Sequence, residues 1–267
     1  MPHCFGFICN DSTLVSVAQR PYEEALTSDS APQGWGLAYY QGGQPLMRKQ
    51  PRGVEGALSF IEQSKGIKAP MIIGQVRDTP EGRNSNENTP PFRYRRWTAT
   101  FCGQVDKYDE VLDELRTAIP EFIQRNIKGK SQAELIFHLF LAFLNDTGKR
   151  DDPRIPANLL ARITHSTFAY LDRVVKKAGG EPRPYIFLTS NGLLMAACHR
   201  EAPLYLARQT NYTDIETGPN ERPISYPHLK AVMLLGGKDP EAAGWESIDD
   251  SAVVVVDDEL SIDLHTA

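Results

Sequence analysis

The order of hydrophobic patterns along the chain is the feature that most constrains its fold. Short apolar runs rich in aromatic and β-branched residues occupy both ends, whereas helical periodicity is concentrated in the middle. Strands followed by helices and again by strands indicate a mixed α+β domain. The expected strands are His3 to Cys9, Met71 to Arg77, Trp97 to Val105, Tyr185 to Thr189, Leu193 to His199, Leu204 to Arg208, Ala231 to Leu235 and Ala252 to Val256, with a last strand that ends near His265.

Two long helices are expected between these groups of strands. Ser131 to Leu144 and Pro156 to Lys177 both carry apolar side chains at helical spacings. His138 falls on the apolar face of the first helix, which favours a buried core histidine over a ligand. The Asn191-Gly192 pair between two apolar runs predicts a tight hairpin.

The size and charge of the chain limit its organisation and its partners. A chain of 267 residues with 41% hydrophobic residues can bury one large core, so residues 1–267 are expected to form a single domain. The formal net charge of -5 gives no reason to expect nucleic acid as a partner, because such binding usually rests on a basic surface. Small molecules or proteins are the expected partners.

Location and redox state also follow from the sequence. No run of about 18 apolar residues could span a bilayer, and Met1 to Cys4 lacks the features of a secretory signal. A cytoplasmic protein without membrane contact is expected. The cysteines have no CxxC spacing and are too sparse for a disulfide framework, so reduced thiols are expected at Cys4, Cys9, Cys102 and Cys198. The histidines show no metal-ligand spacing, and neither a metal site nor a cofactor is expected.

Two polar stretches are long enough to be functional loops or plain solvated surface. They are Ser28 to Gly34 and Asp78 to Arg96. Within the second, Arg93, Arg95 and Arg96 leave open an anion site or a charged strand edge, and the edge is the more common outcome.

Four fragments, read in order, resemble the class II glutamine amidotransferases, in particular the stand-alone γ-glutamyl hydrolase-like branch. Cys4 to Ile8 resembles the family's catalytic cysteine and first strand, displaced by three residues. Gly34 to Tyr40 is similar to its Gly-Trp-Gly strand entry. Gln75 to Phe92 resembles the His-x-Arg-x-x-Thr-x-Gly and Asn-Thr-His-Pro-Phe elements, and Thr100 to Val105 stands where the family has Ala-His-Asn-Gly.

The resemblance covers nearly the whole chain and implies a definite architecture. Tyr185 to Gly192 looks like the strand and hairpin that close the family's second sheet, and Gly244 to Val255 resembles its final strands. The implied fold is a four-layer αββα sandwich of the N-terminal-nucleophile hydrolase type. A chain of this length has no room for a fused synthase domain, so a partner protein or a homo-oligomer is expected.

The resemblance assigns catalytic roles that this sequence fills only in part. In the family an N-terminal cysteine attacks the glutamine amide and its own α-amine acts as the base. Here Cys4 follows Met1, Pro2 and His3, so its nitrogen is an amide. The oxyanion donors would be the backbone of Gly103 and an Asn side chain, but Cys102 stands in the Asn position and its thiol is a weak donor. Phe101 and Pro90 also replace family histidines.

Substrate contacts are likewise implied by the resemblance. Arg77 matches the arginine that binds the α-carboxylate of glutamine. Gln132 stands where the family has the Asp that binds the α-ammonium group, although Ser131 and Glu134 also fit a helix capping box. Trp35, Gly36 and Thr79 complete the candidate substrate site.

Structural explanations remain open for several of these residues. Cys4 could be a small buried strand residue, Trp35 an aromatic plug at a turn, and Arg77 an ion-pair partner. Three functions therefore stay open: an impaired homologue that acts as a binding or regulatory subunit, an active amide hydrolase or amidotransferase with Cys4 as nucleophile after removal of residues 1–3, and a scaffold without a ligand. The resemblance also implies that Cys4 and Cys102 lie close together and can form a reversible disulfide.

Overall fold

Two antiparallel sheets form the centre of the molecule. The computed structural model describes residues 3–77, 84–214 and 224–266. A seven-stranded sheet has the order β11-β9-β10-β1-β4-β2-β3, with bounds Trp245–Ser247, Leu204–Asp214, Ile224–Gly236, Cys4–Cys9, Met71–Arg77, Gly34–Gln41 and Gln44–Gln50. A six-stranded sheet has the order β13-β12-β8-β7-β6-β5, with bounds Ile262–His265, Val253–Asp257, Leu194–Arg200, Tyr185–Ser190, Trp97–Gly103 and Phe92–Tyr94.

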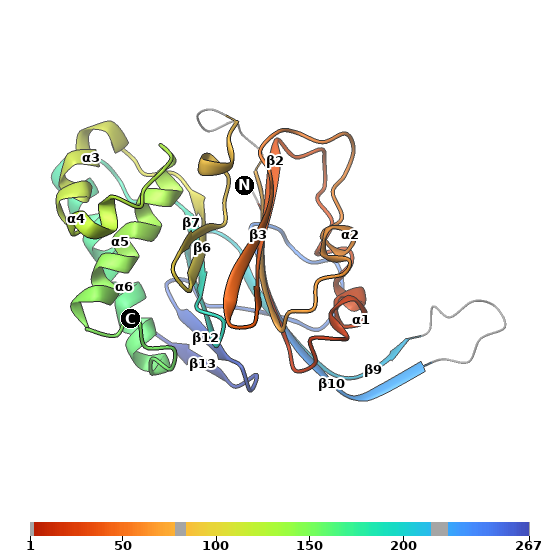
Figure 1. Ribbon diagram of the computed structural model, residues 1–267. Coiled ribbons are helices and arrows are strands. Elements are labelled where there is room, and N and C mark those ends of the chain that lie inside the picture. Colours follow the sequence, from red (N-terminus) through yellow and green to blue (C-terminus); the bar gives the residue numbers. More distant parts are fainter. Residues whose placement is uncertain (1–2, 78–83, 215–223, 267) are drawn as a thin grey trace.

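Helices cover the outer face of each sheet and complete four αββα layers (Figure 1). The six-stranded sheet is covered by α3 to α6, with bounds Tyr108–Thr117, Glu121–Gln124, Gln132–Asp146 and Ala157–Lys177. The seven-stranded sheet is covered by two short helices, α1 (Val15–Gln19) and α2 (Phe60–Ser64). The expected sandwich fold is thereby confirmed. The helices over the six-stranded sheet are longer and more numerous than those over the seven-stranded sheet.

Three apolar clusters correspond to the three interfaces between the four layers. One lies between α3 to α6 and the six-stranded sheet, and a second lies between α1, α2 and the seven-stranded sheet. The third lies between the two sheets and includes Cys4, Ile73, Cys102, Ile186 and Val254. Because both faces of the central strands are covered, β1 is buried along its whole length and its sequence is apolar without alternation.

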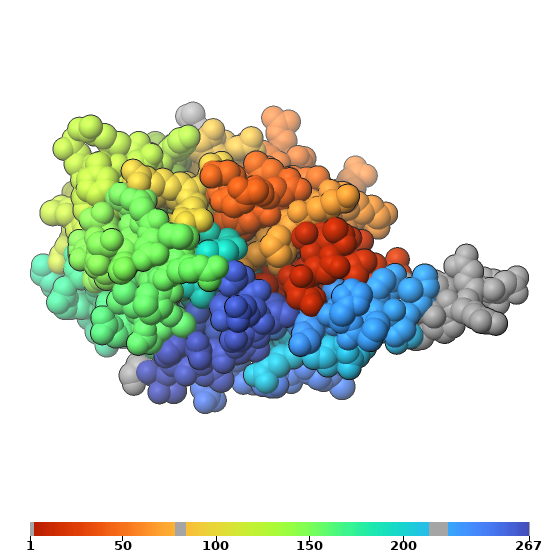
Figure 2. Space-filling model, turned by 60° about the horizontal axis from the view of Figure 1, so that its bottom comes forward, coloured from red at the N-terminus to blue at the C-terminus, as the bar shows by residue number. Residues whose placement is uncertain are grey.

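The longest departure from the expected elements is a two-stranded ribbon. β9 and β10 continue past the ends expected for them, and the first part of β10 is largely exposed. Figures 1 and 2 show these strands extending away from the body of the molecule. None of the helices in the described part of the chain combines the length and the apolar character that crossing a bilayer requires.

Candidate functional site

Cys4 begins the central strand β1 and lies between two neighbouring strands. It is paired with Gln75 of β4 on one side and Gly236 of β10 on the other. The residue is fully buried, and it belongs to the apolar cluster between the sheets. The sheet pairing extends to the residue before Cys4, because the carbonyl of His3 accepts a hydrogen bond from the Val76 nitrogen of β4 at 3.0 Å. The nitrogen of Cys4 is therefore part of a peptide bond within the sheet.

Cys102 belongs to the same cluster but comes from the opposite sheet. It is fully buried on β6 and pairs with Ile186 of β7. Gly236 lies between Ile186, the strand neighbour of Cys102, and Cys4. A Cβ atom built on Gly236 would lie 2.9 Å from Ile186 Cγ2 and 3.3 Å from Cys4 Sγ. The structure thus places both cysteines in the cluster between the two sheets.

Gly103 ends β6 in a position where a side chain does not fit. A Cβ atom there would lie 2.8 Å from Tyr185 Cβ and 3.0 Å from the carbonyl oxygen of Pro184. Such distances are too short for ordinary contact, so packing alone requires glycine at this position.

Gln75 is a site residue that the sequence analysis did not identify. It is 4% exposed, and its Nε2 donates to the carbonyl of Phe101 at 3.5 Å, from one sheet to the other. Its Oε1 is buried and has no hydrogen-bond partner among the described residues. The available signal was a lone amide in the otherwise apolar run Met71 to Val76, since a buried polar group normally has a reason to be there.

Arg77 lies at the end of β4, two residues beyond Gln75, and is 5% exposed. Its Nη2 donates to the carbonyl of Pro51 at 2.8 Å and to Asn84 Oδ1 at 2.8 Å. A weaker contact reaches the carbonyl of Gln33 at 3.4 Å. The guanidinium therefore links the end of β4 to the segments that contain Gln33, Pro51 and Asn84.

Gln132 lies at the first turn of α5, where its Oε1 accepts a hydrogen bond from the nitrogen of Val105 at 2.9 Å. It thereby fixes the chain that leaves β6 after Gly103. Ser131 caps the helix by accepting from Ala133, as the sequence indicated. The Glu134 carboxylate accepts instead from the nitrogens of Lys128 and Gly129, so the reciprocal half of the predicted capping box is wrong.

The side chain of Trp35 points away from Cys4. It belongs to the cluster under α1 and α2, and its ring lies 6.3 Å from that of Phe60, centroid to centroid. It faces this side because alternate residues of β2 point to opposite sides of the sheet. Gly36 faces the inner side, where the Pro90 carbonyl packs against its Cα. Thr79 lies outside the described residues.

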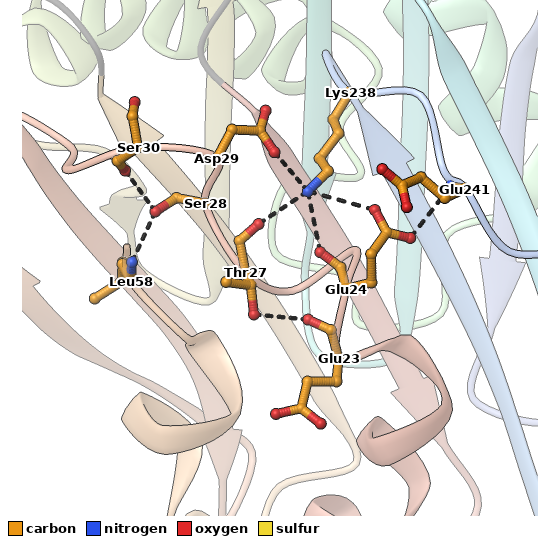
Figure 3. A network of polar contacts seen from close by, with 9 residues as sticks. All are labelled: Glu23, Glu24, Thr27, Ser28, Asp29, Ser30, Leu58, Lys238 and Glu241. Atoms are coloured by element: carbon orange, nitrogen blue, oxygen red, sulfur yellow. Dashed lines mark hydrogen bonds and ion pairs between the residues drawn. The ribbon is translucent and has the colours of Figure 1, made fainter. Parts of the chain in front are cut away.

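Lys238 is the centre of a network of polar contacts with the loop that precedes β2 (Figure 3). The Lys238 ammonium is 2.7 Å from Asp29 Oδ1 and 3.5 Å from Glu24 Oε1, and it donates to the carbonyls of Glu24 and Thr27. Ser28 continues the network by accepting from the nitrogen of Leu58. The loop that precedes β2 is thus held by defined contacts.

His3 lies against this network and is held neutral. Burial, together with the positive charge of Lys238, lowers its pKa to about 4. Its ring packs edge-on against Phe60, with 6.0 Å between centroids. Within residues 3–77, 84–214 and 224–266, no group of three His, Cys, Asp or Glu side chains is placed to hold a metal ion.

The layered architecture indicates the class of the protein. Two antiparallel sheets between helical layers are the fold of the N-terminal-nucleophile amidotransferases, as the solved structures below bear out. The family model described as class-II glutamine amidotransferases matches residues 1–226. The chain belongs to this family.

Solved structures similar to this chain support the fold assignment. A glutamine aminotransferase class-II domain protein from Silicibacter pomeroyi is 14% identical with a TM-score of 0.57, covering 99% of this chain and 98% of that one. A predicted glutamine amidotransferase from Pseudomonas aeruginosa is 15% identical with a TM-score of 0.57, covering 98% and 95%. The comparison with curated proteins found no match.

Longer relatives share the same fold over part of their length. A glutamine phosphoribosylpyrophosphate amidotransferase from B. subtilis, complexed with ADP and GMP, is 12% identical with a TM-score of 0.54. The similarity covers 99% of this chain and 49% of that one. The present chain therefore spans about half of that longer protein.

Proposed function

We propose that this protein is a class II glutamine amidotransferase homologue with an impaired glutaminase site, which acts as a binding or regulatory subunit in the cytoplasm. The observation that carries the proposal is the environment of Cys4. Its nitrogen follows His3, whose carbonyl is bonded into the sheet and whose side chain is 5% exposed. An amide nitrogen cannot accept the proton that the α-amine accepts in the family's reaction.

Two further departures at family site positions support the proposal. Cys102 occupies the position of an oxyanion-hole Asn, and the loss of one such donor typically costs about 100- to 1000-fold in rate. Gln132 can accept a hydrogen bond but supplies no charge for an α-ammonium group, and its Oε1 already accepts from Val105. Arg77 remains as the candidate anchor for a carboxylate, so glutamine or a γ-glutamyl compound is the proposed ligand.

The length of this chain, compared with that of the longer relatives, is consistent with a partner chain. The longer relatives have about half of their length outside the region similar to this chain. If ammonia is transferred at all, the acceptor site would then belong to a partner protein or to a homo-oligomer.

The alternative is an active glutamine or γ-glutamyl amide hydrolase or amidotransferase in which residues 1–3 are removed and Cys4 is the nucleophile. Two preparations separate the readings: one that retains Met1 or Pro2, and one released from an N-terminal fusion so that it starts at Cys4. We expect no ammonia from glutamine above background with the first and little with the second. A Cys4→Ala version of the second preparation is the matched control.

The N-terminal mass of the purified protein decides which form is the natural one. A mass that includes His3 agrees with the proposal, whereas a start at Cys4 together with Cys4-dependent ammonia release would establish the alternative. Robust ammonia release by the preparation that retains His3 would overturn both assignments of the site.

A further inference from the structure

A separate pocket of about 580 Å³ lies between the edge strand β3, the short strand β5 and the helices α4 and α5. The short helical turn η2 (Asn86–Asn88) also lines the pocket. Figure 1 labels β3, α4 and α5. Its described lining includes neither Cys4, Cys102, Gly103 nor Arg77. The pocket is therefore distinct from the inter-sheet site.

Lys49 supplies a cation whose charge is not neutralised within the pocket. Its Nζ donates to the carbonyl of Asn86 at 3.0 Å and lies 5.2 Å from the centroid of the Phe92 ring. Among the described residues no carboxylate lies within ion-pair distance of this ammonium. A neutral carbonyl and an aromatic face leave it able to bind an anion.

The acidic groups of the pocket do not fill that role. Both oxygens of Glu134 accept backbone N–H groups, from Lys128 at 3.0 Å and from Gly129 at 2.7 Å. Glu87 also lines the pocket and is exposed on the short helical turn η2. Neither carboxylate forms a salt bridge with Lys49, although both raise its proton affinity.

Further cations and an exposed ring complete the lining. Arg93 and Lys128 are exposed at the rim, whereas Arg95 is already paired with Asp151 at 2.7 Å. Phe122 is 48% exposed and also lines the pocket, and the Arg150 guanidinium lies 5.2 Å from the centroid of its ring. Cations beside an exposed aromatic face are suited to a ligand that carries both a negative charge and a flat ring.

We propose that this pocket binds a small organic anion, a carboxylate or a phosphate joined to a planar ring, with the anionic group at Lys49 and the ring against Phe122. Burial lowers the pKa of Lys49 to about 8, so the side chain stays mostly protonated at neutral pH. The cost of keeping that charge partly desolvated is offset when an anion binds. This binding is independent of glutamine chemistry at Cys4.

Calorimetric titration of the full chain tests the proposal with paired probes. Adenosine 5′-monophosphate and indole-3-acetate represent the phosphate and carboxylate sources, with adenosine and indole as their neutral counterparts. We expect at least one anion to bind at roughly millimolar concentration or below, and its neutral counterpart to bind at least about tenfold more weakly. If neither anion binds, or if the neutral compounds bind equally well, the proposal is wrong.

Variants locate the binding. Lys49→Met keeps the apolar stem and removes the charge, and we expect it to weaken binding of the anion about tenfold or more. Lys68→Met changes an exposed lysine outside the pocket and should leave the affinity unchanged. Circular dichroism confirms that each variant is folded, and Lys128→Gln at the rim gives a second, milder loss. Binding that persists in folded Lys49→Met protein would exclude this pocket as the site.

Discussion

Gln75 and Phe101 connect the two sheets directly, because Gln75 Nε2 donates to the Phe101 carbonyl at 3.5 Å. Gln75 is the neighbour of Cys4 across β1 and β4, and Phe101 precedes Cys102 on β6. The bond therefore runs beside the two cysteines. The other amide atom, Gln75 Oε1, is buried without a partner among the described residues.

Replacing Gln75 by leucine should change the free energy of unfolding by less than about 1 kcal/mol. One long hydrogen bond is lost, but an unpaired buried oxygen is removed at nearly constant volume. Gln75→Ala is the matched comparison and should cost about 2 kcal/mol, because it leaves a cavity. Urea unfolding measures both. A loss above about 2 kcal/mol in Gln75→Leu would show that Oε1 has a buried partner in solution.

Arg77→Ala should abolish stabilisation of the protein by glutamine. A ligand that binds only the folded state raises Tm, and the increment at a fixed ligand concentration grows with the logarithm of its affinity; the guanidinium is the candidate carboxylate anchor. The variant will also start from a lower Tm, because Arg77 bonds the carbonyl of Pro51 and the side chain of Asn84. The increment on adding glutamine is therefore the quantity to compare, with exposed Arg52→Ala as control. An undiminished increment in Arg77→Ala places the ligand elsewhere.

Stability should fall as pH decreases from about 6.5 to about 4, because burial lowers the pKa values of His3 and His138 to about 4. An unfolded chain protonates these rings from pH 6.5 downward whereas the folded chain does not, so protons favour unfolding throughout this window. The loss is on the order of a few kcal/mol for each ring when pH reaches 4.

Denaturation of His138→Gln across this pH window checks the assignment. The variant keeps an amide that can bond the Glu134 carbonyl, which His138 Nδ1 contacts at 2.8 Å, and it should show a shallower pH dependence. His228→Gln, which changes a histidine whose side chain is 65% exposed, is the surface comparison. Identical slopes for all three proteins would refute the assignment for His138.

Much of the architecture could be predicted because the central strands carry continuous apolar runs. β1, β4, β7 and β12 coincide closely with the expected ranges, and the two long helices start where Ser131 and Pro156 indicated. α3 was missed because only Val111 and Leu115 of this charged segment are fully buried. The ribbon of β9 and β10 was underestimated because its outer part is polar and its pairing is set by the partner strand.

The candidate site was harder to predict. When both faces of a strand are buried, its sequence is apolar throughout and does not show which side chains point to which face of the sheet. β2 is buried from Gly34 to Tyr40, so its sequence does not say that Trp35 faces the outer cluster while Gly36 faces the inner one. The pocket at Lys49 is likewise assembled from segments far apart in the sequence. Arg93, which was considered for an anion site, lines this pocket. The cation at the centre of the pocket, Lys49, comes from β3.

Mild oxidation should join Cys4 and Cys102, and no other pair of cysteines. The chain's four cysteines are buried thiols, and they lie in three different clusters. Cys4 and Cys102 share the cluster between the sheets, whereas Cys9 lies under α1 and α2 and Cys198 lies under the long helices. Burial also raises the pKa values of the Cys9 and Cys198 thiols, that of Cys9 to about 12, which disfavours their reactive thiolates.

Diamide is a suitable oxidant, because it accepts two electrons and two protons as the two thiols become one disulfide. Since both thiols are fully buried, the reaction should be slow in the native protein and should accelerate when low urea increases local opening. A bridge requires Cα atoms about 4.4 to 6.8 Å apart, so the oxidation tests whether β1 and β6 come this close at the two cysteines. Peptide mapping of oxidised protein should recover a Cys4–Cys102 cross-link that thiol reductant reverses and that Cys102→Ala abolishes. Recovery of uncross-linked Cys4 and Cys102 peptides alone, after oxidation in low urea, would show that the sulfurs do not meet.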